Sequence, residues 1–168
     1  AMRKNVMVQA NKEEVCGNPG NEELNTYRKY GYIPYTMGRT SNALDYTFDD
    51  WTVAQMAKAL GKDDDYEFLM KGAENYKNLL HPETKWMTPK DPDSLWKSDF
   101  DLFSNKGFVE GNSWQYLWYV PHDIPGLIDI LGVDLFNKRL EEGFEKSVEH
   151  KFAAHAFDRS EGQRAELY

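Results

Sequence analysis

The spacing of apolar residues along the chain is helical almost throughout. Between residues 43 and 60 they recur at intervals of three and four, and Gly61 ends the run. They form two stripes, made of Leu44, Phe48 and Trp51 on one side and of Val53, Met56, Ala57 and Leu60 on the other. A helix that is apolar over most of its circumference is typically buried. The pattern therefore predicts a buried helix over residues 43–60, opened by the good N-cap residues at 40–42.

Two other segments carry a single apolar stripe opposite a polar face. The first, residues 64–80, has its stripe at Tyr66, Leu69, Met70, Ala73, Tyr76 and Leu80. The second, residues 133–151, has an apolar residue at every fourth position, at Phe136, Leu140, Phe144 and Val148. Both patterns predict amphipathic helices on the outside of a core. We interpret Asp63–Asp65 as a helix start and not as a metal site, because acids stabilise the positive end of a helix.

The remaining elements are shorter and are separated by glycine and proline. Shorter or weaker helical patterns cover residues 2–14, 22–30, 114–120 and 123–131. The sequence predicts a loop at 16–21, an extended segment at 32–35 and a long irregular stretch at 81–111. Buried helices that alternate with amphipathic ones predict an all-α fold of antiparallel helical hairpins. Part of an α/α toroid or solenoid suits that alternation better than a four-helix bundle does.

Length and charge narrow the classes of function. The 168 residues suit one domain or a piece of a larger one. Lys and Arg number 20 against 28 Asp and Glu, and the net charge of -8 argues against nucleic acid or an anionic membrane surface as a partner. No apolar run approaches the ~20 residues of a membrane span, and the N-terminus lacks the apolar segment of a signal peptide. Cys16 is the only cysteine, so the sequence predicts no internal disulfide.

The aromatic content is high for so polar a chain. Aromatic residues make up 14% of it, while the mean hydropathy is -0.75. One explanation is a core of large rings whose polar atoms reach water. The other is a carbohydrate site, where ring faces cover the apolar face of a sugar and carboxylates accept its hydroxyl protons; composition by itself favours the core. The four histidines show no zinc spacing, so no metal ligand is predicted.

Two segments place acidic groups in apolar surroundings. Asp45 and Asp49 lie four residues apart, on one face of a helix with buried character. The alternative is that this face opens to solvent near the positive end of the helix. Glu110 lies at a loop-to-helix junction among several aromatic residues, an environment that suits a general acid. The alternative is that Glu110 satisfies N–H groups at the helix start.

Several stretches of the chain resemble glycoside hydrolase family 92, the calcium-dependent, inverting exo-α-mannosidases. They are GYIP at 31–34, SNALDYTFDDWTVAQMAKALGK at 41–62, YKNLLHPETKWM at 76–87 and VEGNSWQYLWYVPHDIPGLI at 109–128. The resemblance covers most of the chain and implies an (α/α)6 toroid catalytic domain, preceded in the full enzyme by a β-sandwich domain. Residues 1–168 would then be about the first half of the toroid, without the β-sandwich domain and the C-terminal half.

The same resemblance implies roles for individual residues. Glu110 would be the general acid that protonates the departing sugar oxygen. Asp49 foremost, together with Asp45 and Asp50, would bind mannose hydroxyl groups. The rest of the substrate pocket would be lined by Trp114, Gln115, His122 and Asp123. The substrates would be mannose-containing glycans, most commonly linked α-1,2, and hydrolysis would invert the anomeric centre.

Two parts of the family's pattern are not found in this sequence. The family's general base and its calcium ligands both lie further downstream. Because an inverting glycosidase needs two carboxyl groups ~6.5–9.5 Å apart, we expect the isolated chain to be inactive or nearly so. We also expect exposed inner-helix faces to cause self-association. The resemblance implies a periplasmic or secreted protein; the alternative function is a non-catalytic helical module that binds carbohydrate or a protein.

Overall fold

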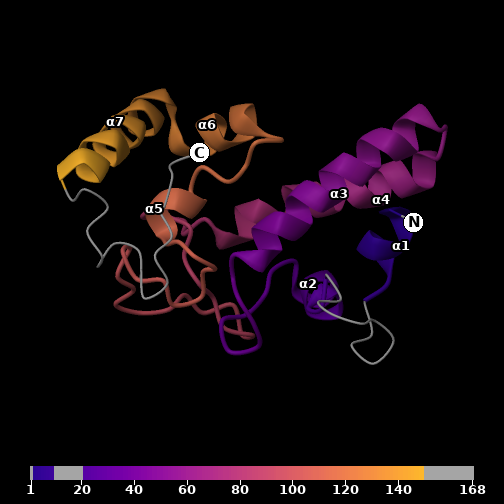
Figure 1. Ribbon diagram of the computed structural model, residues 1–168, viewed down its shortest axis with the longest axis horizontal. Helices are drawn as coiled ribbons and strands as arrows, with labels where there is room; N and C mark the ends of the chain where they lie inside the picture. The colour runs from indigo at the N-terminus through magenta and orange to yellow at the C-terminus, as the bar shows by residue number, and fades with distance from the viewer. Residues whose placement is uncertain (1, 10–20, 150–168) are drawn as a thin grey trace.

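The computed structural model describes residues 2–9 and 21–149 (Figure 1). The helices are α1 (Met2–Met7), α2 (Leu24–Tyr30), α3 (Asn42–Ala59), α4 (Asp63–Ala73), the 3-10 helix η1 (Glu74–Leu79), α5 (Ser113–Tyr116), α6 (Ile124–Leu131) and α7 (Val133–Glu149). Within these ranges no strand forms, and extended residues pair only at two isolated bridges, Leu80 with Met87 and Lys90 with Trp96. The all-α prediction is confirmed. Cys16, the predicted loop around it and the chain after Glu149 lie outside the described residues.

Two pairs of consecutive helices frame the molecule (Figure 1). A short turn at residues 60–62 reverses the chain, so α3 and α4 lie side by side as an antiparallel hairpin. Gly132, with a φ of 79°, separates α6 from α7, and these two helices also contact each other. The short α5 lies below α7 in Figure 1, and the irregular stretch 81–111 lies below α5. The predicted helical hairpins are therefore present, and a large irregular segment joins them.

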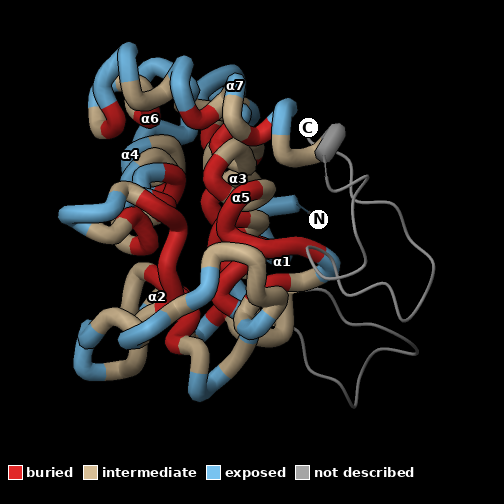
Figure 2. Tube along the Cα trace, turned by 90° about the vertical axis from the view of Figure 1, so that its left-hand side faces the viewer, coloured by how far each residue is buried: buried red, intermediate tan, exposed pale blue. Residues whose placement is uncertain are grey.

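The main core runs through the centre of the molecule, where the trace is buried (Figure 2). Its fully buried side chains include Tyr27, Ile33, Leu44, Tyr76, Leu79, Met87, Leu117 and Leu127. These residues come from helices at both ends of the molecule and from the irregular stretch, so that stretch packs into the core. A smaller cluster of Val6, Val53, Ala54 and Leu69 holds α1 against the α3–α4 hairpin.

The predicted helix 64–80 changes geometry part of the way along. It is α-helical as α4 and then continues as the 3-10 helix η1. The carbonyl oxygen of Gly72 accepts a hydrogen bond from the Tyr27 hydroxyl at 2.9 Å, and that of Ala73 lies 2.9 Å from Nε2 of His122. Because side chains from distant segments take up these two carbonyls, the regular α-helical pattern changes where they lie.

Two other helix predictions need correction. The end of α3 is buried on one side only: Ala57 is buried, but Met56 is 47% exposed and Leu60, in the turn that follows, is 68% exposed at the tip of the hairpin. The predicted helix 114–120 is only the single turn of α5, and turns carry the chain from Leu117 to the residue before α6. No helix in the described ranges is both long and apolar enough to cross a membrane.

Candidate active site

Two acidic side chains on α3 form the first part of the site. Asp45 and Asp49 are one helical turn apart, and both are half-buried. Burial raises the pKa of Asp45 to about 6, although the hydrogen bond from the Tyr119 hydroxyl opposes this and the negative charge of Asp49 adds to it. Burial also raises the pKa of Asp49, whose Oδ2 lies 3.5 Å from the Asn21 amide nitrogen. A proton is therefore held more firmly on this face of α3 than on a solvated carboxylate.

Glu110 lies on the loop that leads into α5. The helix start is fixed by a capping box, in which Oδ1 of Asn112 accepts from the Trp114 N–H at 2.9 Å and Oε1 of Gln115 accepts from the Asn112 N–H at 3.2 Å. Glu110 precedes this box, is exposed, and has a φ of 51°. A non-glycine residue in this left-handed region is strained, and such strain is concentrated at functional sites. The backbone at Glu110 is therefore held in a conformation that costs energy.

Hydrogen bonds and ring contacts join the Glu110 loop to α3. The Ser41 N–H donates to the Gly107 carbonyl at 3.1 Å, and the Ser41 hydroxyl accepts from the Val109 N–H at 3.0 Å. On the other side the Tyr116 ring meets the Tyr119 ring edge-on at 6.1 Å between centroids, and Tyr119 donates to Asp45. The loop bearing Glu110 and the acids of α3 are therefore parts of one region, although they are far apart in the sequence.

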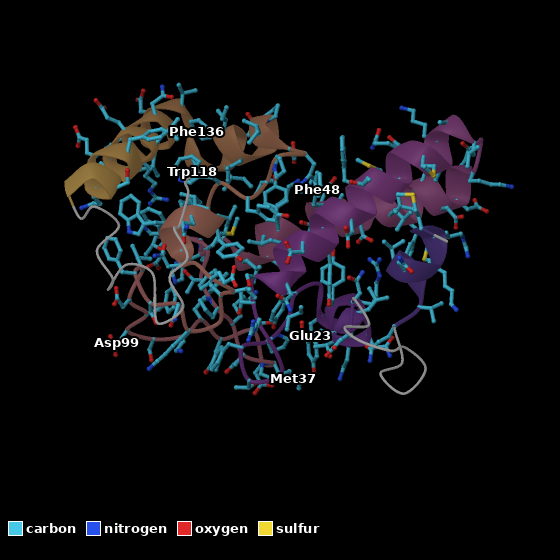
Figure 3. All side chains as sticks on the ribbon, viewed as in Figure 1. Glu23, Met37, Phe48, Asp99, Trp118 and Phe136 are labelled. Carbon is cyan, nitrogen blue, oxygen red and sulfur yellow. The ribbon has the colours of Figure 1, made fainter. Side chains whose placement is uncertain are left out.

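Aromatic rings and His122 lie along the same helix. Phe48 and Trp51 stack on each other at 6.0 Å between centroids, and both contact the His122 ring. Figure 3 shows Phe48 between α3 and the segment that leads into α6. Nε2 of His122 faces the Ala73 carbonyl, so this nitrogen carries a proton, and burial lowers the pKa of the imidazole. His122 is therefore a neutral ring in an aromatic setting against α3.

Asp50 and Asp123 both have carboxylates that bond protein groups in this structure. Asp50 is 1% exposed, and its carboxylate accepts from the Arg28 guanidinium at 2.6 Å. The Tyr27 hydroxyl lies 3.1 Å from the same carboxylate and shares its one proton between Asp50 and the Gly72 carbonyl. Asp123 caps α6 by accepting from the Gly126 N–H at 3.0 Å, and it accepts from the Tyr76 hydroxyl at 2.8 Å. Both carboxylates hold protein groups in place, and their contact with mannose hydroxyl groups stays a prediction.

Trp114 and Gln115 support α5 from within. Trp114 is 8% exposed and packs against Trp86 at 4.5 Å and Phe103 at 5.8 Å between ring centroids. It borders a hollow of about 560 Å³ that side chains of α7 close on one side. Gln115 is engaged in the capping box. Gln115 therefore fixes the start of α5 and Trp114 packs into the core, and their contact with substrate stays a prediction.

The sequence interpretation missed three residues of the site: Phe48, Trp51 and Tyr119. Helical spacing was available as a signal for the first two, because Phe48 follows Asp45 by three positions and Trp51 follows Phe48 by three. Tyr119 offered no such signal, since its bond to Asp45 depends on how the turn after α5 folds back. Among the described residues, no group of three His, Cys, Asp or Glu side chains is arranged to hold a metal ion.

Asp45 makes the stability of the fold depend on pH. Its pKa is about 6 in the folded chain against 3.8 for the free side chain, so the folded state keeps a proton that the unfolded state has released. Stability should therefore fall as the pH rises from about 4 to about 6. We expect Asp45→Asn, which can still accept from Tyr119, to raise the unfolding free energy at pH 7.5 by on the order of 1–2 kcal/mol.

Urea unfolding of the two chains at a series of pH values checks this expectation. The difference between Asp45→Asn and the parent should vanish below about pH 4, where the parent is protonated as well. A variant that is less stable than the parent at every pH would contradict the account. Asp65→Asn is a control for loss of a surface acid on a neighbouring helix, because Asp65 pairs with the exposed Arg3 instead.

Comparison with known proteins shows to which family this chain belongs. The description of the matching family is "Glycosyl hydrolase family 92 catalytic domain", and the match extends over residues 1–166. An uncharacterized secreted glycosidase of Arthroderma benhamiae is 24% identical over 147 residues, which are 67% of this chain and 19% of that protein. The chain therefore spans about a fifth of the length of this relative.

Solved structures agree with this assignment. A family 92 inverting mannosidase of Bacteroides thetaiotaomicron superimposes with a TM-score of 0.77 and 33% sequence identity, over 84% of this chain and 19% of that one. A family 92 α-mannosidase of the same bacterium gives a TM-score of 0.72 and 38% identity, over 84% of this chain and 18% of that one. The likeness agrees with part of an (α/α)6 toroid. This chain belongs to glycosyl hydrolase family 92, as part of its catalytic domain.

Proposed function

We propose that this chain forms the acid-bearing part of an exo-α-mannosidase active site, in which Glu110 is the general acid. The observation that carries the proposal is the placement of Glu110. An exposed carboxyl group is held on a strained backbone, in a loop hydrogen-bonded to the start of the helix that bears Asp45 and Asp49. The similar Bacteroides enzymes are mannosidases, one of them solved with mannoimidazole, which supports mannose as the sugar.

Glu110 would give its proton to the glycosidic oxygen as the bond to the anomeric carbon breaks. The departing sugar then leaves as a neutral alcohol, and the developing charge on the mannose ring is neutralised when water adds from the opposite face. Inversion requires a second carboxyl group to take a proton from that water, ~6.5–9.5 Å from the first. We assign this base to a part of the protein outside the described residues.

The acids and rings of α3 would hold the sugar. Asp45 and Asp49 can accept hydrogen bonds from two hydroxyl groups, and the stacked rings of Phe48 and Trp51 can cover an apolar sugar face. The neutral imidazole of His122 packs against both rings and would hold them in place. In this division of roles the α3 groups would bind the sugar and Glu110 would act on the glycosidic bond.

Several finer features belong to the same proposal. The linkage is α-1,2, the protein is exported to the periplasm or secreted as the Arthroderma relative is described, and its substrates are mannose-containing glycans. The resemblance implies calcium, and no group of three His, Cys, Asp or Glu side chains in residues 2–9 and 21–149 is arranged to hold it. Self-association of the chain stays a prediction; exposed apolar residues such as Leu60, Val133 and Phe144 are consistent with it.

The anomeric form of the released sugar tests the proposed reaction. The natural protein that carries this segment is incubated with α-1,2-mannobiose, and the anomeric protons are followed by NMR. We expect β-mannose to appear before α-mannose, and the α-1,3 and α-1,6 isomers to react more slowly. The 168-residue chain by itself should release no mannose above background. Release of α-mannose first, or rapid turnover by the isolated chain, would contradict the proposal.

A further inference from the structure

The carbonyl next to Glu110 carries a short hydrogen bond from α5. The hydroxyl of Tyr116 donates to the Val109 oxygen at 2.6 Å, which is at the short end of the range for O–H···O bonds. Tyr116 is the last residue of α5, and its ring also packs on Phe108 at 5.2 Å between centroids. The tyrosine therefore reaches back from the helix to the peptide that joins Val109 to Glu110.

Three side chains hold the backbone on the two sides of Glu110. Before it, the Val109 N–H donates to Ser41 and the Val109 carbonyl accepts from Tyr116. After it, the Asn112 N–H donates to Gln115. The strained conformation of Glu110 lies between these fixed points. A strained residue persists only where its surroundings hold it, and these three bonds are such surroundings.

Gly111 allows Tyr116 to come this close. A Cβ atom at position 111 would lie 2.9 Å from Cε2 of Tyr116 and 2.6 Å from Oε1 of Gln115. Any larger residue there would push one of these side chains away from the backbone that it holds. The glycine, the tyrosine and the glutamine thus form one close-packed support under the Glu110 loop.

We propose that Tyr116 is a positioning residue for Glu110, which it orients through the Val109 carbonyl. The inference rests on the proposed function, in which Glu110 is the acid. Proton transfer needs the acid within about 3 Å of the glycosidic oxygen, so a small shift of the loop slows the reaction. The edge-on contact of Tyr116 with Tyr119, which bonds Asp45, also links the acid to the sugar-binding face. The Tyr116–Tyr119 ring pair therefore connects the loop that bears Glu110 to the face of α3 that bears Asp45.

The test compares Tyr116→Phe with Glu110→Gln in the natural protein that carries this segment. The substrates are aryl α-mannosides whose leaving groups range from good to poor. A misplaced acid matters most where the leaving group needs a proton. We therefore expect Tyr116→Phe to reduce kcat/KM by roughly 10–100-fold for poor leaving groups and little for good ones. Equal losses across the series would mean that Tyr116 has only a structural role and would overturn the inference.

Tyr119→Phe is the matched control for the leaving-group dependence. It removes the same kind of hydroxyl three residues away and leaves the Val109 carbonyl untouched, but it releases Asp45. We expect it to raise KM and to keep the parent's leaving-group dependence. If Glu110→Gln itself had no effect, the proposed function would fail. If Glu110→Gln slowed poor leaving groups and Tyr116→Phe did not, the function would stand and only this inference would fall.

Hydrogen exchange gives a second readout that needs no activity. In the 168-residue chain we expect Tyr116→Phe to speed exchange of the Val109 and Glu110 amides by roughly three- to tenfold, because the bond that holds their shared peptide is gone. Amides inside α3 and α4 should keep the exchange rates of the parent, which shows that the fold is intact. Unchanged exchange at Val109 and Glu110 would contradict the positioning role.

Discussion

Glu110→Gln should lower the rate of hydrolysis of unactivated α-mannosides by roughly 10²–10⁴-fold, the contribution expected of a general acid. The amide has nearly the shape of the carboxyl group but has no acidic proton to give. Glu110 is exposed, and the loop is held through the backbone of its neighbours, so the exchange should leave the fold unchanged. Initial rates on α-1,2-mannobiose, with melting curves of both proteins, measure the effect.

The substrate series separates loss of the acid from loss of binding. With an aryl mannoside whose leaving group is already a weak base, Glu110→Gln should recover most of the parent rate, since no proton is needed there. Asp49→Asn is the matched control, because it also neutralises a site carboxylate but should raise KM for every substrate alike. An equal loss for Glu110→Gln on all substrates would remove Glu110 from the role of acid.

Asp50→Ala should destabilise the chain by about 3–5 kcal/mol, the usual effect of removing one partner of a buried ion pair. Asp50 is the charged anchor between α2, α3 and α4, because it binds Arg28 and Tyr27 while Tyr27 also bonds Gly72. Burial raises the pKa of Asp50 even though Arg28 opposes the shift, so desolvation outweighs the attraction. Removal of the carboxylate would leave the Arg28 charge poorly solvated. Urea unfolding of the 168-residue chain measures the loss.

A double replacement shows whether the unpaired charge of Arg28 causes the loss of stability. In Arg28→Met/Asp50→Leu both charges are gone and apolar groups of similar size take their place, so we expect most of the stability to return. Asp64→Ala, an exposed acid in the first turn of α4, should cost well under 1 kcal/mol. A loss for Asp50→Ala as small as that of Asp64→Ala would show that the ion pair adds nothing to the fold.

The helices that the periodicity predicts best are those whose pattern is local. The bounds of α3 and α6 and the start of α7 follow from apolar spacing and from local signals, such as the capping residue Asp123 at the start of α6 and Gly132 after its end. The predicted end of the last helix, at residue 151, lies outside the described residues. The change from α4 to η1 could not be predicted. It depends on Tyr27 and His122, which reach the carbonyls of Gly72 and Ala73 from distant parts of the chain.

The candidate site was predictable to a similar extent. Asp45 and Asp49 share a helix face by spacing, and the surroundings of Glu110 were unusual in the sequence itself. Asp50 is adjacent to Asp49 in the sequence and lies on another face of α3, where it bonds Arg28 and Tyr27. A single sequence does not show which acid finds a buried cation, since that depends on tertiary contacts.

A structure of the Glu110→Gln variant of the natural protein, with an intact α-1,2-mannobiose bound, tests the central claim most directly. The account predicts residue 110 within about 3 Å of the glycosidic oxygen, in reach for proton transfer. It also predicts hydroxyl groups of the mannose on Asp45 or Asp49, and a ring face against Phe48 or Trp51. A disaccharide bound with a different carboxyl group at the glycosidic oxygen, and with the α3 acids out of reach, would contradict it.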